Sequence, residues 1–166
     1  MAMCDEPLAP QTLLPEMTPG TVLAIFGFRA CAVGRAGCCT LRSAYQRALA
    51  DDCPTALANM LTFVRMVGYH GRRRVRLSVP GCGRMTADEM LVAAIFAACQ
   101  AKDYRLRNAH LTWLLAQPPS VSISGLVMEI ADCFARNSLP IEAPAQPIHL
   151  KEPSPSALRA YQGGRA

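Results

Sequence analysis

Residues 79–101, "VPGCGRMTADEMLVAAIFAACQA", join a turn signal to one of the most apolar stretches of the chain. Thr86 and Glu89 have the spacing of a capping box, in which the threonine hydroxyl accepts from the Glu89 amide and the Glu89 carboxylate accepts from the Thr86 amide. The helix that follows, to about residue 101, is hydrophobic nearly all round, which is typical of a central helix. We expect Thr86→Ala to cost about 1 kcal/mol, and Glu89→Ala to cost less, because it removes only one side of the box.

Further helix signals lie on both sides of this segment. Thr18 before Pro19, Thr40, Asp103, and Ser120 or Ser122 are predicted to cap helices. Hydrophobic periodicity predicts that Leu106, His110, Trp113 and Leu114 form the inner side of the fifth helix. The predicted helices span about 19–33, 41–50, 54–68, 87–101, 104–117 and 123–137.

These helices predict an all-α fold, a compact bundle of about six helices over residues 18–139. The chain has 166 residues, of which 51% are hydrophobic and only 6% aromatic, a composition that favours close helix packing over a β-sandwich. Residues 1–17, with three prolines, predict a flexible leader, and residues 140–166, with five, a Pro-rich disordered tail. The alternating residues 72–80 predict an extended, half-buried linker.

Two features concern the cellular location. The longest apolar runs, near residues 22–33 and 90–99, are shorter than the ~20 residues that a membrane-spanning helix needs. The N-terminus is acidic and broken by prolines, unlike a signal peptide. We therefore predict a cytoplasmic protein with no membrane contact, in which the thiols are reduced.

The chain has eight cysteines but no Cys-x-x-Cys pair. Cys99 and Cys133 fall within apolar helical patterns, where a free cysteine packs as a small hydrophobic residue. Cys82 precedes a helix and neighbours Arg84, so we expect its thiol pKa to be lowered and its reactivity increased.

A second interpretation groups Cys82 with Cys31, Cys38 and Cys39. Four thiolates would hold zinc or an iron–sulfur cluster, with His70 and His110 as alternative ligands, and a single reactive thiol would instead sense redox state. The spacing does not support a metal site, so we favour structural cysteines with no cofactor and keep zinc or an iron–sulfur cluster as the alternative.

Positive charge is concentrated in the first half of the core. Residues 17–87 hold ten arginines and two acids, whereas residues 88–166 hold seven basic and seven acidic residues. Arginine side chains match phosphate and carboxylate groups, so the sequence predicts an anion-binding or nucleic-acid-binding site at Arg72, Arg73, Arg74, Arg76 and Arg84. The alternative is an exposed, solvated linker, because no aromatic residue lies among these arginines to stack on bases.

Two segments carry a resemblance. "FGFRACAVG", residues 26–34, and "VPGCGRMTADEMLV", residues 79–92, resemble a family of short bacterial helical proteins with a domain of unknown function. That family has a Cys-Gly-Arg-Met-Thr run before its central helix, and the resemblance covers about residues 20–138. It implies a helical architecture and no particular activity. Members have more cysteines before the Gly-Arg pair, whereas this chain has Gly81 in one such position.

The sequence contains no paired-carboxylate, Ser/His/Asp, phosphate-loop or His-Glu-x-x-His pattern. We therefore predict a non-enzymatic interaction or regulatory module whose partner is another protein. The alternatives are a cysteine-based metal or redox-sensing protein and an arginine-rich binder of nucleic acid or another polyanion.

Overall fold

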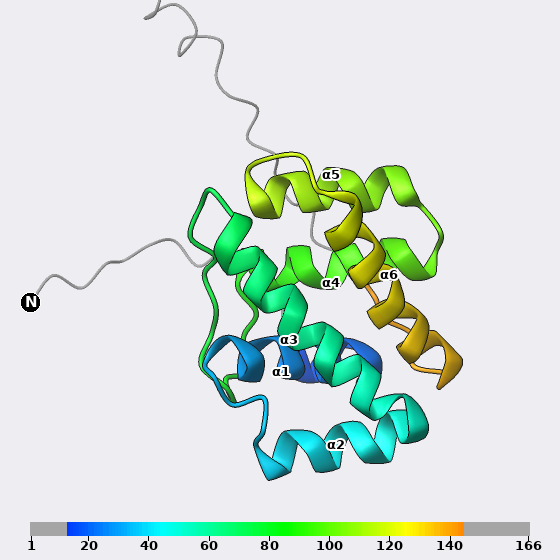
Figure 1. Ribbon diagram of the computed structural model, residues 1–166. Helices are drawn as coiled ribbons and strands as arrows, with labels where there is room; N and C mark the ends of the chain where they lie inside the picture. Colours follow the sequence, from blue (N-terminus) through cyan, green and yellow to red (C-terminus); the bar gives the residue numbers. More distant parts are fainter. Residues whose placement is uncertain (1–12, 145–166) are drawn as a thin grey trace, which may run out of the picture.

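Helix α4 (Ala87–Gln100) is the central element of the computed structural model, which describes residues 13–144. Ten of its residues are buried, and it packs against α1 (Pro19–Ala32), α5 (Tyr104–Leu115) and α6 (Val121–Arg136). Figure 1 shows α4 crossing the middle of the bundle. The prediction of a central helix after residue 86 is therefore confirmed.

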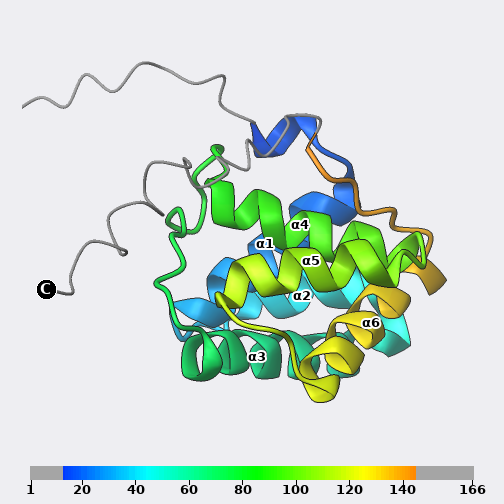
Figure 2. The same ribbon diagram turned by 90° about the horizontal axis from the view of Figure 1, so that it is seen from above.

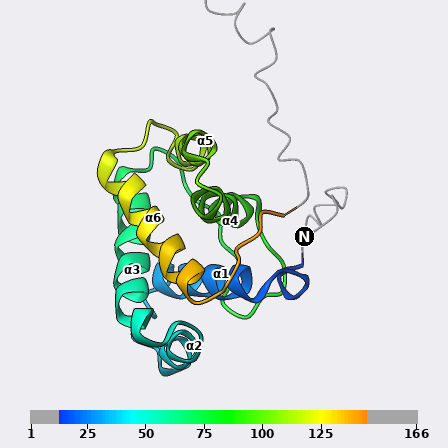
Figure 3. The same cartoon turned by 90° about the vertical axis from the view of Figure 1, so that its right-hand side faces the viewer.

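The remaining helices complete an all-α fold. Helices α2 (Cys39–Leu49) and α3 (Cys53–His70) follow α1, and single 3-10 turns span Leu14–Glu16 and Ala50–Asp52. Helix α3 packs against α1, α2 and α6, while α2 and α5 lie at opposite ends of the bundle (Figures 1 and 3). Within residues 13–144 there is no strand, only an isolated antiparallel bridge between Leu13 and Arg84.

Most predicted helix starts are confirmed. The side chains of Thr18, Thr86, Asp103 and Ser120 accept hydrogen bonds from backbone amides three residues later. Helix α2 differs, because it begins at Cys39 rather than after a Thr40 cap. The amide of Arg42 already donates to the Cys38 carbonyl at 3.0 Å, which places Thr40 inside the first turn.

A buried ion pair joins α1 to the start of α4. Arg29 is 1% exposed and Glu89 is fully buried. The Arg29 guanidinium donates from Nε to Glu89 Oε1 at 2.7 Å and from Nη2 to Oε2 at 2.8 Å. Such a pair is tolerated in a core only when its remaining hydrogen-bonding capacity is also used.

The loop before α4 supplies the other partners of this pair. Arg29 Nη1 donates to the Cys82 carbonyl and Nη2 to the Arg84 carbonyl, each at 2.6 Å. The amides of Ser78 and Thr86 donate to Glu89 at 2.9 and 2.8 Å. Glu89 therefore completes the capping box and also neutralises Arg29, a second role that the capping pattern does not reveal.

Residues 71–86 join α3 to α4 without a strand and include the linker predicted over residues 72–80. Hydrogen bonds to the side chains of Asp88 and Glu89 hold this segment in place of a sheet. Val75 and Leu77 pack against the core, while Arg74 and Arg76 are exposed. The predicted alternation ends at Val79, which is 73% exposed. The chain turns there, with the Cys82 amide donating to the Val79 carbonyl at 3.0 Å.

Both predicted tails contribute residues to the fold. In the predicted leader, Leu14 is buried and its amide donates to the Gly83 carbonyl at 2.7 Å. In the predicted tail, Ile141 is buried and its amide donates to Gln100 Oε1 at 2.8 Å. Packing thus extends a few residues beyond the predicted boundaries at residues 17 and 140, because these short segments bury an apolar side chain and satisfy a backbone amide. Residues 1–12 and 145–166 lie outside the described part of the chain.

The two roles of Glu89 reverse the order of stabilities expected from the sequence. Glu89→Ala leaves Arg29 buried without its counter-charge, which costs about 3–5 kcal/mol, whereas Thr86→Ala costs about 1 kcal/mol. Urea denaturation of the two variants measures both values. Asp132→Ala removes an exposed acid from α6 and serves as the control, with an expected change within about 0.5 kcal/mol. A Glu89→Ala variant no less stable than Thr86→Ala would contradict this assignment.

Candidate functional site

Helix α5 is rotated relative to the prediction from its sequence. Of the four predicted inner residues only Leu114 is fully buried, while Leu106 is 45% and Trp113 51% exposed. The buried face is instead formed by Arg107, Leu111, Leu114 and Leu115. The apolar residues that the periodicity assigned to the core are therefore partly open to solvent.

The burial of Arg107 accounts for this rotation. Its guanidinium lies over the Tyr104 ring, 5.1 Å from the ring centroid, and donates from Nε and Nη2 to Asn108 Oδ1. Its aliphatic stem can therefore be buried while the charged group keeps polar partners. A hydrophobicity pattern counts arginine as polar and so places it on the wrong side of the helix.

The exposed side of α5 forms one wall of an apolar groove with a volume of about 1020 Å³. Helix α4, which lies beside α5 in Figures 2 and 3, forms the other wall, and Ala143 and Pro144 lie along an edge. The apolar residues of the two walls recur at the three- and four-residue spacing of a helix face. They are Met90, Leu91 and Ala94 from α4, and Leu106, Ala109 and Trp113 from α5.

The polar side chains that line this groove, His110 excepted, hydrogen-bond within the protein. Arg73 donates from Nη2 to Asp88 Oδ1 at 2.6 Å and from Nε to the Trp113 carbonyl at 2.9 Å. Gln117 donates to the His70 carbonyl. Partial burial lowers the pKa of His110 from 6.5, against a smaller opposing effect of Asp103, so this imidazole is neutral at pH 7.

The five arginines predicted to bind anions do not form one cluster. Arg73 is paired with Asp88, whereas Arg72, Arg74, Arg76 and Arg84 are exposed. The Arg72 amide donates to the Leu115 carbonyl and the Arg76 amide to Asp88 Oδ2. Residues 72–76 therefore cross the end of the groove where α4 begins and α5 ends. Trp113, distant in sequence, lies beside them.

The four predicted metal-binding cysteines are likewise separated into different environments. Cys31 is buried in α1, and burial raises its thiol pKa to about 11. Cys82 is half-buried in the loop before α4, whereas Cys39 is exposed at the start of α2. Nowhere in the described range 13–144 do three His, Cys, Asp or Glu side chains lie close enough to hold a metal ion. The predicted four-thiolate site is therefore not assembled.

Cys99 and Cys133 occupy the core, as predicted. Cys38 instead stands out among the partly exposed thiols. Although no side-chain hydrogen bond caps α2, the adjacent amides of Thr40 and Leu41 lower the pKa of the Cys38 thiol below 9.0. The start of a helix stabilises a thiolate in this way. The helix-start argument that we applied to Cys82 thus applies to Cys38.

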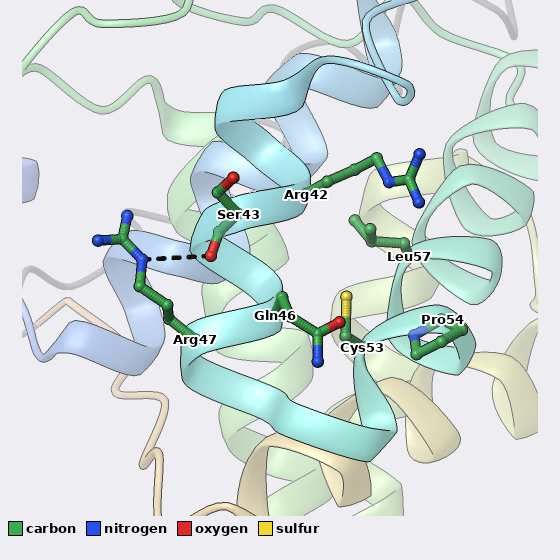
Figure 4. Close-up of a pocket in the computed structure, with 7 residues that line it drawn as sticks. All are labelled: Arg42, Ser43, Gln46, Arg47, Cys53, Pro54 and Leu57. Atoms are coloured by element: carbon green, nitrogen blue, oxygen red, sulfur yellow. Dashed lines mark hydrogen bonds between the residues drawn. The ribbon is translucent and has the colours of Figure 1, made fainter.

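A second, smaller hollow of about 720 Å³ lies between α2 and α3. Figure 4 shows the Cys53 sulfur facing this hollow, with the guanidinium groups of Arg42 and Arg47 on opposite sides of α2. Arg47 donates to the Ser43 carbonyl at 3.3 Å. Because the two arginines diverge, they do not form a shared anion site.

No protein-family model, curated protein or solved structure matches this chain. The resemblance to a bacterial helical family thus stays a prediction. Among the described helices, none combines the length and the apolar character needed to cross a bilayer.

The thiol environments predict an order of alkylation. At pH 8, Cys38 should react with iodoacetamide faster than Cys31 or Cys99, because a lowered pKa increases the thiolate fraction, whereas the other two thiols have pKa values of about 11. Peptide mass spectrometry of timed samples measures the rates. Cys38→Ser should remove the fast reaction at this position, while the neighbouring Cys39→Ser variant keeps it. First reaction at Cys82 would instead support the expectation from the sequence.

Proposed function

We propose that this protein is a non-enzymatic interaction module that binds an apolar segment of a partner protein in the groove between α4 and α5. The observation that carries this proposal is the exposure of Leu106 and Trp113 on the helix face that the sequence marks as inner. Large apolar side chains gathered in one groove favour association, because burying them removes apolar surface from water.

The shape of the groove suits a helix. Its walls are two packed helices whose apolar residues follow helical spacing, so a third helix can insert its side chains between theirs. The stretch from Leu106 to Ala116, the residue that caps the end of α5, corresponds to about 15 Å, or nearly three turns, at 1.5 Å per residue. A partner helix of roughly this length would cover the exposed face of α5.

The paired charges at the end of the groove, Arg73 and Asp88, favour binding over catalysis. Arg73 and Asp88 neutralise one another, and the Arg73 guanidinium also donates to the Trp113 carbonyl. A catalytic acid or base needs a proton that a substrate can reach. These groups instead hold the walls of the groove together, which suits a preformed binding surface.

We place the module in the cytoplasm. The seven cysteines within residues 13–144 are all free thiols. Reduced cysteines are the normal state in that compartment.

Thiol-based regulation is the second candidate function, and the environment of Cys38 favours it. This thiol is partly exposed and its pKa is lowered by the start of α2. Helix α2 lies at the opposite end of the bundle from α5 (Figure 3). Oxidation at Cys38 would therefore change the protein surface at the α2 end of the bundle, away from the groove.

Trp113 provides a direct test, because it is the only tryptophan of the chain and lines the groove. The probe is a synthetic amphipathic peptide with leucines at positions i, i+3, i+4 and i+7 and glutamines on its polar face. We expect a saturable blue shift of the Trp113 emission, because the peptide would remove water from the indole.

A matched pair of variants locates the binding. Ala109→Glu places a charge in the groove and should abolish the shift, whereas Ala58→Glu makes the same change on an exposed position of α3 and should leave it unchanged. A peptide that leaves the emission of the parent protein unaltered, or that binds Ala109→Glu equally well, would refute the proposal.

A further inference from the structure

Three exposed arginines stand at one end of the groove between α4 and α5. The amide of Arg72 is bonded to the Leu115 carbonyl at 2.8 Å, close to the end of α5. The amide of Arg76 is bonded to Asp88 Oδ2 at 2.6 Å, at the start of α4. Arg74 lies between them, so these three exposed residues belong to the backbone segment that crosses this end of the groove, next to Arg73, which lines it.

The backbone that carries these arginines is held in place. Arg73 is anchored to Asp88 and to the Trp113 carbonyl, and the Arg76 carbonyl accepts from Thr86 Oγ1 at 2.7 Å. A ligand therefore does not have to order this segment when it binds, which lowers the entropic cost of the contact.

The charge of the three arginines is not neutralised by the described part of the protein. The ion pairs within residues 13–144 are Arg29–Glu89, Arg73–Asp88 and Arg136–Asp52, and none involves Arg72, Arg74 or Arg76. Asp88, the carboxylate at this end of the groove, already pairs with Arg73. The groove is thus apolar along its length and positively charged at one end.

We propose that the partner segment is an acidic amphipathic helix, with its apolar face in the groove and carboxylates placed beside Arg72, Arg74 and Arg76. This inference rests on the function proposed above and adds the chemistry of the partner. Arginine donates in a fork that matches carboxylate groups. The positively charged end of the groove would therefore select helices with acidic side chains and set the direction in which such a helix binds.

Other occupants match this arrangement less well. A nucleic acid would use the arginines but would leave most of the apolar wall uncovered. Residues 145–166 carry three basic residues and one acid, and the whole chain has a net charge of +5. The chain's own C-terminal segment and a second copy therefore lack the complementary charge.

The experiment compares three synthetic peptides with the same leucine positions and with glutamate, glutamine or lysine on the polar face. Binding is followed by fluorescein anisotropy and by Trp113 emission. At low salt we expect the glutamate peptide to bind about tenfold more tightly than the glutamine peptide, since several exposed ion pairs, each of modest strength, would act together. The lysine peptide should bind most weakly. The advantage should shrink as salt is added, because salt screens exposed charges.

Two triple variants carry the same change in net charge. Arg72→Gln/Arg74→Gln/Arg76→Gln should remove the advantage of glutamate while leaving the affinity for the glutamine peptide unchanged. Arg35→Gln/Arg42→Gln/Arg47→Gln removes three exposed arginines near α2, far from the groove, and should leave both affinities unchanged. If the first triple variant does not fold, the single Arg74→Gln variant should reduce the advantage in the same direction.

The outcomes separate the two proposals. Equal binding of the three peptides at low salt, or an equal loss of the glutamate advantage in both triple variants, would overturn the acidic partner and leave the interaction module intact. Peptides that do not change Trp113 emission would instead refute the module itself. A single-stranded oligonucleotide that displaces the glutamate peptide and depends on the same three arginines would overturn this inference in favour of nucleic acid. So would self-association of the full chain that excludes the peptides.

Discussion

The fold depends on one buried contact, the ion pair between Arg29 and Glu89. Removing two charges from water is costly, and the cost is offset here by geometry: every charged oxygen and most guanidinium protons have a partner. Those partners include backbone groups of the loop that precedes α4. The pair thus positions a loop that has neither a sheet nor an apolar core of its own.

The organisation of the candidate site follows from that loop. Once Glu89 holds the amides of Ser78 and Thr86, the neighbouring Asp88 side chain receives the Arg76 amide and the Arg73 guanidinium. Arg73 in turn reaches the Trp113 carbonyl of α5. A connected set of hydrogen bonds therefore runs from the last turn of α1 to the wall of the groove. It sets both the end of the groove and the position of its arginines.

The sequence identifies the apolar face of α5 without identifying what covers it. Periodicity groups Leu106, His110 and Trp113 with Leu114 because they share one side of a helix. In the folded protein, Arg107 and Leu111 turn toward the core and leave Leu106 and Trp113 at the groove. The difference between the two assignments marks the surface that we interpret as functional. An apolar helix face can be buried by packing within its own chain or by packing against a partner protein.

The sequence by itself determined the helices of this protein, because caps such as Thr86, Asp103 and Ser120 form hydrogen bonds over only three residues. It also determined that Cys99 and Cys133 are core residues, since apolar periodicity surrounds both. The tertiary structure decided which groups meet. Arg29 and Glu89 are sixty residues apart, and no local pattern pairs them. Tertiary contacts also divided the predicted sets: Asp88 pairs with Arg73 and leaves Arg72, Arg74 and Arg76 exposed. The four cysteines lie on different elements, because no local pattern brings Cys82 to Cys31.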